Sequence, residues 1–443
     1  MRHLVSSPLS GVEPIDNKPK RTLVSALIWA CFLYWAAPAA AYDYPIADPF
    51  LATVVGTPAP LRAPLPTDVP FKRRSIRVLE REAPDALWYD QALRYSYAAQ
   101  KGPAPLVFTI AGTGAAHDGS KNWLAARAFY SKGFHVVALG SPVSANFVVA
   151  ASSSGVPGGA FEDAADLYRA MQKIRDELQG KLEITDYYLA GYSLGAFNAA
   201  HVSYLDAEQK VFDFRRVLMM NPPVRLYSSI SLLDRMLENI PGGPDNFDAF
   251  YEKIVDAVGQ AYRRSDSVRF DEELLFKAFE VLRPTDELLA SLIGLVFRIA
   301  SANMAFTADV MTDFGFIKPS NVRLTRNTDL RVYNEVAMRL GFTDYFHAFF
   351  YPYRASLEPG LSRGELIERM SLVTIGDYLR GADDIYLIHN ADDLILEAGE
   401  IEILEDLFGE RATIFPRGGH MGNMESRDYI GRMLSIMTPG AAP

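Results

Sequence analysis

The sequence predicts an α/β fold in which helices cover both faces of a mostly parallel sheet. Two observations predict it. Short, almost continuous apolar runs alternate with segments of helical periodicity, and this alternation stops for about 150 residues before it resumes. The chain has 443 residues, of which 49% are hydrophobic and 22% are charged. This composition is typical of a globular protein that buries a large core.

The first 41 residues have the pattern of a secretory signal peptide. Basic residues at 18–21 precede an apolar run at 23–37, and three alanines at 39–41 offer a cleavage point. We therefore expect an exported protein, periplasmic or secreted. If the signal is not cleaved, residues 23–37 would instead anchor the chain in the membrane. Cleavage after Ala41 would remove four basic and two acidic residues, which makes the net charge of −10 more negative by two.

Charge and cysteine content exclude several classes of function. No block of Lys and Arg follows the first 25 residues, and the chain is acidic overall, so a nucleic-acid partner is not expected. Cys31 is the only cysteine and lies in the predicted signal. A lipid-attachment role fits it poorly, because Trp29 precedes it and the apolar run continues beyond it. The mature chain would have no thiol, so we expect no cysteine nucleophile and no metal site built on cysteine.

A proline-rich, extended arm is expected at residues 42–74, before the sheet begins. Alternating stretches at 75–80 and 86–97 predict early antiparallel strands. Further strands are expected at 106–110, 135–139, 187–190 and 216–220, and helices at 123–131, 161–178 and 196–205. The nearly continuous apolar character of these later strands is typical of strands that are covered on both faces.

The alternation stops at residue 225. Residues 225–376 have mostly helical periodicity, for example at 288–300, and no clear series of strands. Strands resume at 385–388 and 412–415, and a closing helix is expected at 427–437. The simplest organisation is one α/β core, made of residues 75–224 and 377–443, which a helical insertion interrupts.

A G-x-S-x-G segment lies between a predicted strand and a predicted helix. It reads Gly191-Tyr192-Ser193-Leu194-Gly195. This context is that of a nucleophile elbow, a sharp turn that exposes a strained serine above the sheet. Glycines on both sides avoid side-chain clashes in such a turn. We therefore expect Ser193 to be a nucleophile, and an ordinary glycine-rich turn is the alternative interpretation.

A serine hydroxyl needs a base before it can attack a substrate. His420 is the candidate, because it follows the last predicted strand in a loop with three nearby glycines. A solvent-exposed loop histidine is the alternative. The acid that orients this base should precede it in the chain. Asp393 and its neighbour Asp392 both follow the strand at 385–388, and both stay candidates.

An oxyanion hole needs two preorganised hydrogen-bond donors. The N–H of Leu194, directly after the serine, is expected to be one. The loop at 111–116 follows a buried strand, and the N–H of Thr113 or of Gly114 is expected to be the other. The glycines of this loop do not have the spacing of a phosphate-binding loop. We expect His117, next to the loop, to be solvated.

These motifs resemble those of the α/β-hydrolase superfamily. The resemblance rests on the strand and loop at 106–112, the elbow at 191–195, the turn at 390–393 and the pair Gly419-His420. It implies an eight-stranded, mostly parallel sheet and a triad in the chain order Ser, Asp, His. By this resemblance Ser193 is the nucleophile, Asp393 the acid and His420 the base. The sequence departs from the family in having Ala111-Gly112 where His-Gly is usual.

The predicted function is that of a serine hydrolase that forms an acyl-enzyme with a small-molecule or lipid-like ester, without a metal or cofactor. The insertion falls where many members of the superfamily carry a lid. Its aromatic stretch at 342–353 indicates either core packing of a helical subdomain or a hydrophobic substrate tunnel. For a lipid-like substrate, association with a membrane surface is also expected. A transacylase or a peptidase with the same triad, and an inactive binding protein of this fold, are the alternatives.

Overall fold

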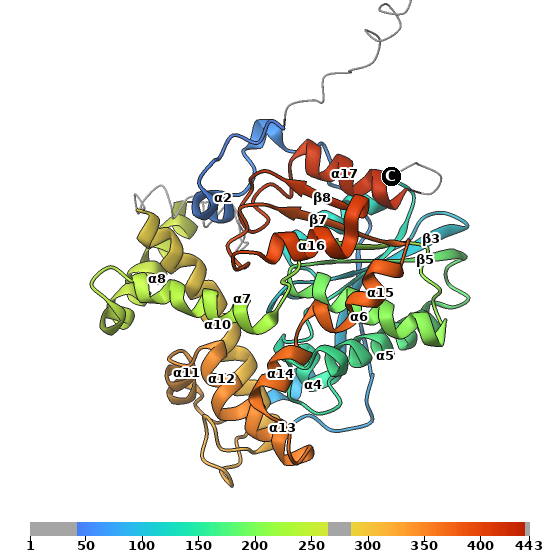
Figure 1. Ribbon diagram of the computed structural model, residues 1–443. Helices are drawn as coiled ribbons and strands as arrows, with labels where there is room; N and C mark the ends of the chain where they lie inside the picture. Colours follow the sequence, from blue (N-terminus) through green and yellow to red (C-terminus); the bar gives the residue numbers. More distant parts are fainter. Residues whose placement is uncertain (1–41, 265–284, 439–443) are drawn as a thin grey trace, which may run out of the picture. The chain divides into compact units, whose positions relative to one another are not determined.

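One eight-stranded sheet organises the part of the chain that the computed structural model describes, residues 42–264 and 285–438 (Figure 1). The strand order is β1-β2-β4-β3-β5-β6-β7-β8. The strands are β1 (Lys72–Ile76), β2 (Leu93–Ala98), β3 (Ala104–Ile110), β4 (His135–Leu139), β5 (Ile184–Tyr192), β6 (Val217–Met220), β7 (Ile385–Asn390) and β8 (Ala412–Phe415). Strand β2 is antiparallel to both of its neighbours, β1 and β4. The six strands β4, β3, β5, β6, β7 and β8, in sheet order, are parallel to one another. The predicted signal peptide lies outside the described residues.

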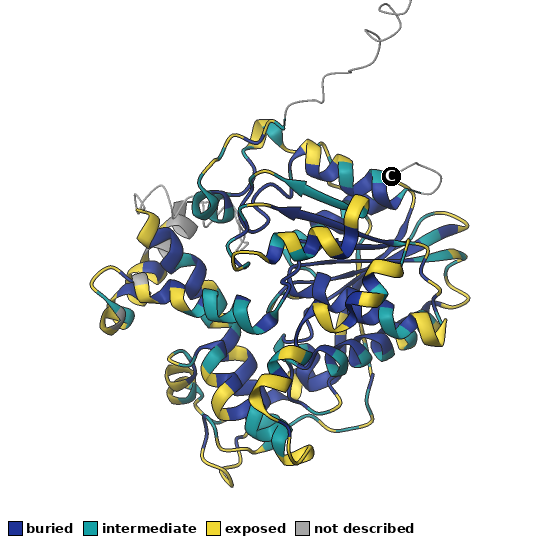
Figure 2. Ribbon diagram, viewed as in Figure 1, coloured by how far each residue is buried: buried dark blue, intermediate teal, exposed yellow. Residues whose placement is uncertain are grey.

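Helices cover the sheet on both faces, as the alternation predicts. Along β3, Leu106 and Phe108 pack with α5 (Ala160–Leu178), α6 (Leu194–Gln209) and α16 (Glu400–Phe408) in one apolar cluster. Val107 packs with α3 (Ser120–Ser131) and α17 (Arg427–Met437) in the other. The central parallel strands are therefore buried on both sides and mostly dark blue in Figure 2, whereas the residues of the edge strand β8 have intermediate burial.

The early antiparallel pair differs from the prediction. Strand β1 ends at Ile76, and residues 86–90, predicted to be extended, lie in the 3₁₀ helix η2 (Asp85–Asp90). β1 pairs on one side only, with β2, and four of its five residues are exposed. An exposed edge strand carries charged residues, here Lys72, Arg73 and Arg74, that discourage pairing with other chains. A strand with so many exposed residues has no apolar alternation, so the sequence pattern could not predict the bounds of β1.

The arm that precedes the sheet is not extended throughout, which corrects the prediction. Residues 49–55 form α2 (Pro49–Val55), and residues 59–61 form the short 3₁₀ helix η1 (Ala59–Leu61). Asp48 caps α2 by accepting a hydrogen bond from the N–H of Leu51 at 2.6 Å. Pro49 stands at the first helical position, where the missing N–H removes no helical bond. The proline that suggested irregular structure therefore starts a helix.

Between β6 and β7 the described residues contain helices and turns and no strand of the sheet. The helices are α7 (Leu226–Arg235), α8 (Phe247–Arg264), α10 (Asp286–Thr312), α11 (Arg331–Ala337), α12 (Phe342–Tyr345), α13 (Tyr351–Leu357), α14 (Arg363–Arg369) and α15 (Gly376–Gly381), with a π-helical segment, η5 (Phe346–Phe350). We call this segment the helical insertion. The limits predicted for it, residues 225 and 376, stay predictions.

Helix α10 is a long, apolar helix of the helical insertion. Among the described residues it is the one helix that is long and apolar enough to cross a membrane by length and composition, with a mean hydropathy of 1.7 over its most apolar window. Within the protein 61% of that window is buried. Core helices of folded domains show the same properties, because they too are covered by apolar neighbours.

Two carboxylates of α5 hold the loop that directly precedes α5 in the chain. Asp163 accepts a hydrogen bond from the N–H of Gly158 at 2.9 Å, and Asp166 accepts one from the N–H of Ser153 at 2.7 Å. Asp163 is buried. Burial raises the pKa of its carboxyl well above the ordinary value, against the effect of the Gly158 hydrogen bond. The uncharged acid is therefore the form that the fold prefers.

This raised pKa predicts a stability that depends on pH. The contribution of Asp163 is fully present below the pKa of the unfolded chain and is lost as the pH rises through the folded pKa. Asp163→Asn is uncharged at every pH. We expect it to melt at a higher temperature than the wild type near pH 8, and the difference to shrink toward about pH 4. Calorimetry across this range measures it, with Asp176→Asn, an exposed site on the same helix, as control. A lower melting temperature of Asp163→Asn near pH 8 would contradict the prediction.

Candidate active site

Strand β5 runs into α6 through a tight turn that carries Ser193. The serine has φ 54° and ψ −127°, a strained conformation for a residue with a side chain. Its N–H donates to the carbonyl of Met220 at 2.8 Å. A Cβ atom at Gly191 would lie 2.1 Å from the carbonyl oxygen of Gly195, and one at Gly195 would lie 2.2 Å from that of Ile110. The turn therefore requires glycine at both positions.

Ser193, His420 and Asp393 are joined by hydrogen bonds. Nε2 of His420 lies 3.0 Å from Oγ of Ser193, and Nδ1 lies 3.0 Å from both carboxylate oxygens of Asp393. The three residues follow β5, β8 and β7, so they meet at the carboxyl edge of the sheet. All three are less than 9% exposed. This is the geometry that a nucleophile, a base and an orienting acid need.

Asp392, the other candidate acid, makes different contacts. Its carboxylate accepts hydrogen bonds from the N–H groups of Gly418 and Gly419 at 3.1 and 2.9 Å. These amides lie directly before His420 in the chain. Asp393 is therefore placed to orient the imidazole, and Asp392 is placed to hold the loop that carries it.

The carboxylate of Asp393 is ionised although it is buried. Burial alone would raise its pKa, but the charge of His420 and its hydrogen bond, with His389 and the amide of Asn221, outweigh this effect. The pKa of Asp393 consequently lies below the ordinary value for an aspartate. A carboxylate that stays charged at neutral pH can stabilise the imidazolium that forms when the base takes a proton.

The structure adds residues that the sequence analysis missed. Nδ2 of Asn221 donates to Oδ2 of Asp393 at 2.8 Å, and the hydroxyl of Tyr429 donates to Oδ1 of Asn221 at 2.9 Å. The N–H of Ile395 donates to the other oxygen of Asp393 at 3.2 Å. Asn221 has φ 50°, a left-handed conformation that asparagine adopts more readily than most residues. In the sequence, the one signal for Asn221 was its position directly after a buried strand.

The two candidates for the second oxyanion donor lie in different places. Thr113 and Leu194 line the same cavity as Ser193. Gly114 does not line it. Its φ is 70°, and a Cβ atom there would lie 2.8 Å from Cβ of Ala300. Of the two, Thr113 is therefore the one that shares the cavity with Ser193 and Leu194.

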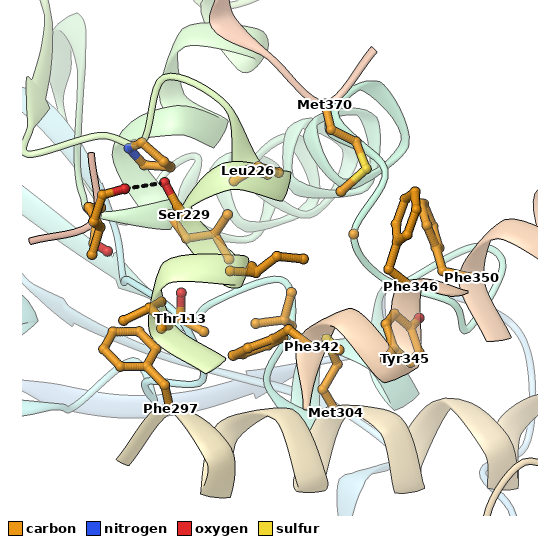
Figure 3. Close-up of a pocket in the computed structure, with 18 residues that line it drawn as sticks. Thr113, Leu226, Ser229, Phe297, Met304, Phe342, Tyr345, Phe346, Phe350 and Met370 are labelled. Carbon is orange, nitrogen blue, oxygen red and sulfur yellow. Dashed lines mark hydrogen bonds between the residues drawn. The ribbon is translucent and has the colours of Figure 1, made fainter. Parts of the chain in front are cut away.

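A narrow apolar cavity opens beside Ser193 (Figure 3). The space between its lining atoms is about 700 Å³, including the part that is open to solvent. None of its described lining residues is charged, and its polar side chains are those of Thr113, Ser193, Ser229 and Tyr345. Figure 3 shows Thr113 on one side, and Phe346, Phe350 and Met370 on the other. The helical insertion supplies most of this lining.

Two of these polar side chains bond to the protein itself. The hydroxyl of Ser229 donates to the carbonyl of Ile395 at 2.6 Å, and that of Tyr345 donates to the carbonyl of Pro157 at 2.9 Å. Such a site favours a ligand portion that is apolar and uncharged, since buried polar groups of a ligand would need partners that the cavity does not offer.

His117 is buried, which corrects the expectation that it is solvated. It is 7% exposed, and Nδ1 lies 2.8 Å from Oγ of Ser96 on β2. Burial lowers the pKa of its imidazole, so the neutral form is favoured. Within residues 42–264 and 285–438, no group of three His, Cys, Asp or Glu side chains could hold a metal ion.

By sequence, the chain matches no family model and no curated protein. Solved structures to which it is similar include an esterase from Pyrococcus furiosus, at 9% identity over 84% of this chain and 92% of that one, with a TM-score of 0.41. An esterase from Pyrobaculum calidifontis is 15% identical over 86% of both chains, with a TM-score of 0.39. A bacterial membrane phospholipase A is 15% identical over 83% of this chain and 86% of that one, with the same TM-score.

Substitution by asparagine is expected to have different effects at Asp393 and at Asp392, because the two carboxylates make different contacts. In Asp393→Asn the charge that faces His420 is lost, and we expect the rate at which a fluorophosphonate labels Ser193 to fall by about 10⁴-fold. Asp392→Asn keeps one of the two oxygens that accept from the Gly418 and Gly419 amides and leaves the charge of Asp393 in place, so its labelling rate should fall far less. An equal or larger loss in Asp392→Asn would show that the assignment of the acid is wrong.

Proposed function

We propose that this chain, which has the α/β-hydrolase fold, is a serine hydrolase that cleaves esters of apolar acyl groups. The observation that carries the proposal is the hydrogen-bonded series Ser193–His420–Asp393 at the mouth of an uncharged cavity. A buried serine on a strained turn, within 3.0 Å of an imidazole, has little structural purpose other than nucleophilic attack.

The reaction would proceed in two steps. Oγ of Ser193 attacks the ester carbonyl while Nε2 of His420 takes its proton, and ionised Asp393 stabilises the resulting imidazolium. The N–H groups of Leu194 and Thr113 are the proposed donors to the tetrahedral oxyanion. His420 returns the proton to the leaving alcohol. A water molecule, deprotonated by the same imidazole, then releases the acid from Ser193.

The cavity supports an apolar acyl group as the part of the substrate that is recognised. A narrow, uncharged space fits an alkyl chain or an aromatic ring better than a sugar or a charged peptide. Each buried CH₂ group contributes about 0.8 kcal/mol to binding in such a space. A lipid-like ester, met at a membrane surface after export, is consistent with this interpretation, and export itself rests on the sequence of residues 1–41.

A transacylase is the second candidate, because Ser193 is only 7% exposed. A sheltered acyl-enzyme loses less of its acyl group to water and can pass it to an alcohol or amine instead. The peptidase alternative lacks a charged group in the cavity that would hold a peptide. The inactive binding protein would not need a base within bonding distance of the serine.

Covalent labelling tests the nucleophile. We expect a fluorophosphonate to label the wild-type protein, and Ser193→Ala to give no labelling, because Oγ of Ser193 is the attacking atom. Ser356→Ala, an exposed serine of α13, is the control that should label normally. Mass spectrometry of the labelled peptide identifies the site. Absence of labelling in the folded wild type would support the inactive binding protein.

Ester chain length tests the cavity. For p-nitrophenyl esters from acetate to dodecanoate, kcat/KM should rise about fourfold per CH₂ group until the cavity is full. Met370→Trp should lower the rate for long esters and spare acetate, because Met370 lies opposite Thr113 in the cavity (Figure 3). Val373→Trp, at an exposed position nearby in the chain, is the matched control. A maximal rate with acetate would contradict an acyl cavity.

Adding an alcohol to the same assay separates the two candidates. A hydrolase releases the free acid as its main product, and a transacylase forms the new ester instead.

A further inference from the structure

The backbone of His420 is bonded to the arm that precedes the sheet. Its N–H donates to Oγ1 of Thr53 on α2 at 2.8 Å. The hydroxyl of Thr53 in turn donates to the carbonyl of Pro49 at 2.7 Å. Because its proton is used in that bond, Oγ1 is held as an acceptor toward His420. The two residues are 367 positions apart in the chain.

The glycines around His420 are required by this arm. A Cβ atom at Gly419 would lie 2.2 Å from the carbonyl oxygen of Pro49 and 2.5 Å from Oγ1 of Thr53. One at Gly422 would lie 2.0 Å from the carbonyl oxygen of Ala52. Neither position therefore has room for a side chain. The close approach that the structure contains is to α2.

Further contacts join the arm to the same loop. The hydroxyl of Thr57 donates to the carbonyl of Gly422 at 2.8 Å, and the N–H of Ala63 donates to the carbonyl of Glu425 at 2.8 Å. Arg62 forms an ion pair with Glu425 at 2.7 Å. The arm therefore runs along the outside of the loop that carries His420.

The loop is held on its other side by the core of the protein. Asp392 accepts hydrogen bonds from the two amides before His420, and Nδ2 of Asn390 donates to the carbonyl of Gly419 at 2.8 Å. The next amide, that of His420 itself, is held by Thr53. Successive N–H groups are thus bound from opposite sides, which restricts where the backbone of His420 can lie.

Helix α2 also lies against the wall of the cavity. Phe50 and Val54 pack with Ile293 of α10 and with Ile395, and Ile395 lines the cavity beside Ser193. The arm therefore connects the histidine loop with the substrate side of the site.

We propose that the arm is a positioning element of the active site, and that Thr53 is its principal residue because it sets the place of His420. This inference rests on the proposed serine hydrolase. Thr53 touches neither substrate nor the reacting atoms, so it acts through the backbone of the base. Displacing a catalytic group by 1 Å can lower the rate by about 100-fold.

The test replaces the Thr53 hydroxyl in the full chain. Thr53→Val has a similar shape and lacks the acceptor, and we expect its kcat for a short ester to fall by about 10- to 100-fold with little change in KM. Thr53→Ser keeps the acceptor and should restore most of kcat. Thr67→Val, an exposed threonine of the same arm, is the matched control and should behave as the wild type.

A second variant separates positioning from stability. Thr57 is buried and bonds to Gly422 on the same loop, but it does not contact His420. If the arm only stabilised the fold, Thr57→Val would lower kcat at least as much as Thr53→Val. We expect the opposite order for kcat, while the melting temperature falls more in Thr57→Val. If Thr53→Val does not fold, Thr53→Ala is compared with Thr53→Ser by the same criterion.

The outcomes distinguish this inference from the proposed function. If the wild type is neither labelled by a fluorophosphonate nor active on esters, the proposed function fails. If the wild type is active and Thr53→Val has the same kcat, the function stands and the positioning role of Thr53 is overturned. A loss that Thr53→Ser does not restore would also overturn it, because the hydroxyl would then not be the group that matters.

Discussion

The buried, ionised carboxylate of Asp393 is the constraint on which the arrangement of the site depends. An isolated charge in a protein interior costs several kcal/mol, so it persists only with partners placed around it. Here His420, Asn221 and the N–H of Ile395 supply them. They come from the turns after β8, β6 and β7, so satisfying one carboxylate fixes three turns of the sheet relative to one another. The imidazole is oriented toward Ser193 as part of the same arrangement.

The core and the helical insertion contribute different properties. The polar residues of the site lie on turns that follow strands of the sheet, where hydrogen bonds from several turns meet. The apolar cavity is built mostly by the helical insertion, whose Phe297, Phe342, Phe346 and Phe350 line it without a charged neighbour. A substrate would be recognised by one part of the chain and attacked by the other. In the proposed enzyme, such a division would let the acyl preference change while the reacting groups stay in place.

The arm adds a third contribution from the beginning of the described chain. Backbone atoms of α2 approach Gly419 and Gly422 so closely that no side chain could stand at either position. Hydrogen bonds hold α2 and the loop at these short distances. The close packing that results leaves the loop little room to move. The loop that carries His420 is consequently held from outside by α2 and from inside by Asp392.

Local patterns in the sequence determined the parallel strands, the helices that cover them and the nucleophile elbow. Apolar periodicity and the spacing of Gly191, Ser193 and Gly195 are properties of neighbouring residues, so they can be read along the chain. Tertiary structure alone brought Asp393, and not Asp392, to the imidazole of His420, brought Asn221 to the carboxylate and placed Thr53 beside His420. These contacts join residues 27, 172 and 367 positions apart. No local pattern encodes such pairs, because they depend on how β6, β7, β8 and α2 pack in space.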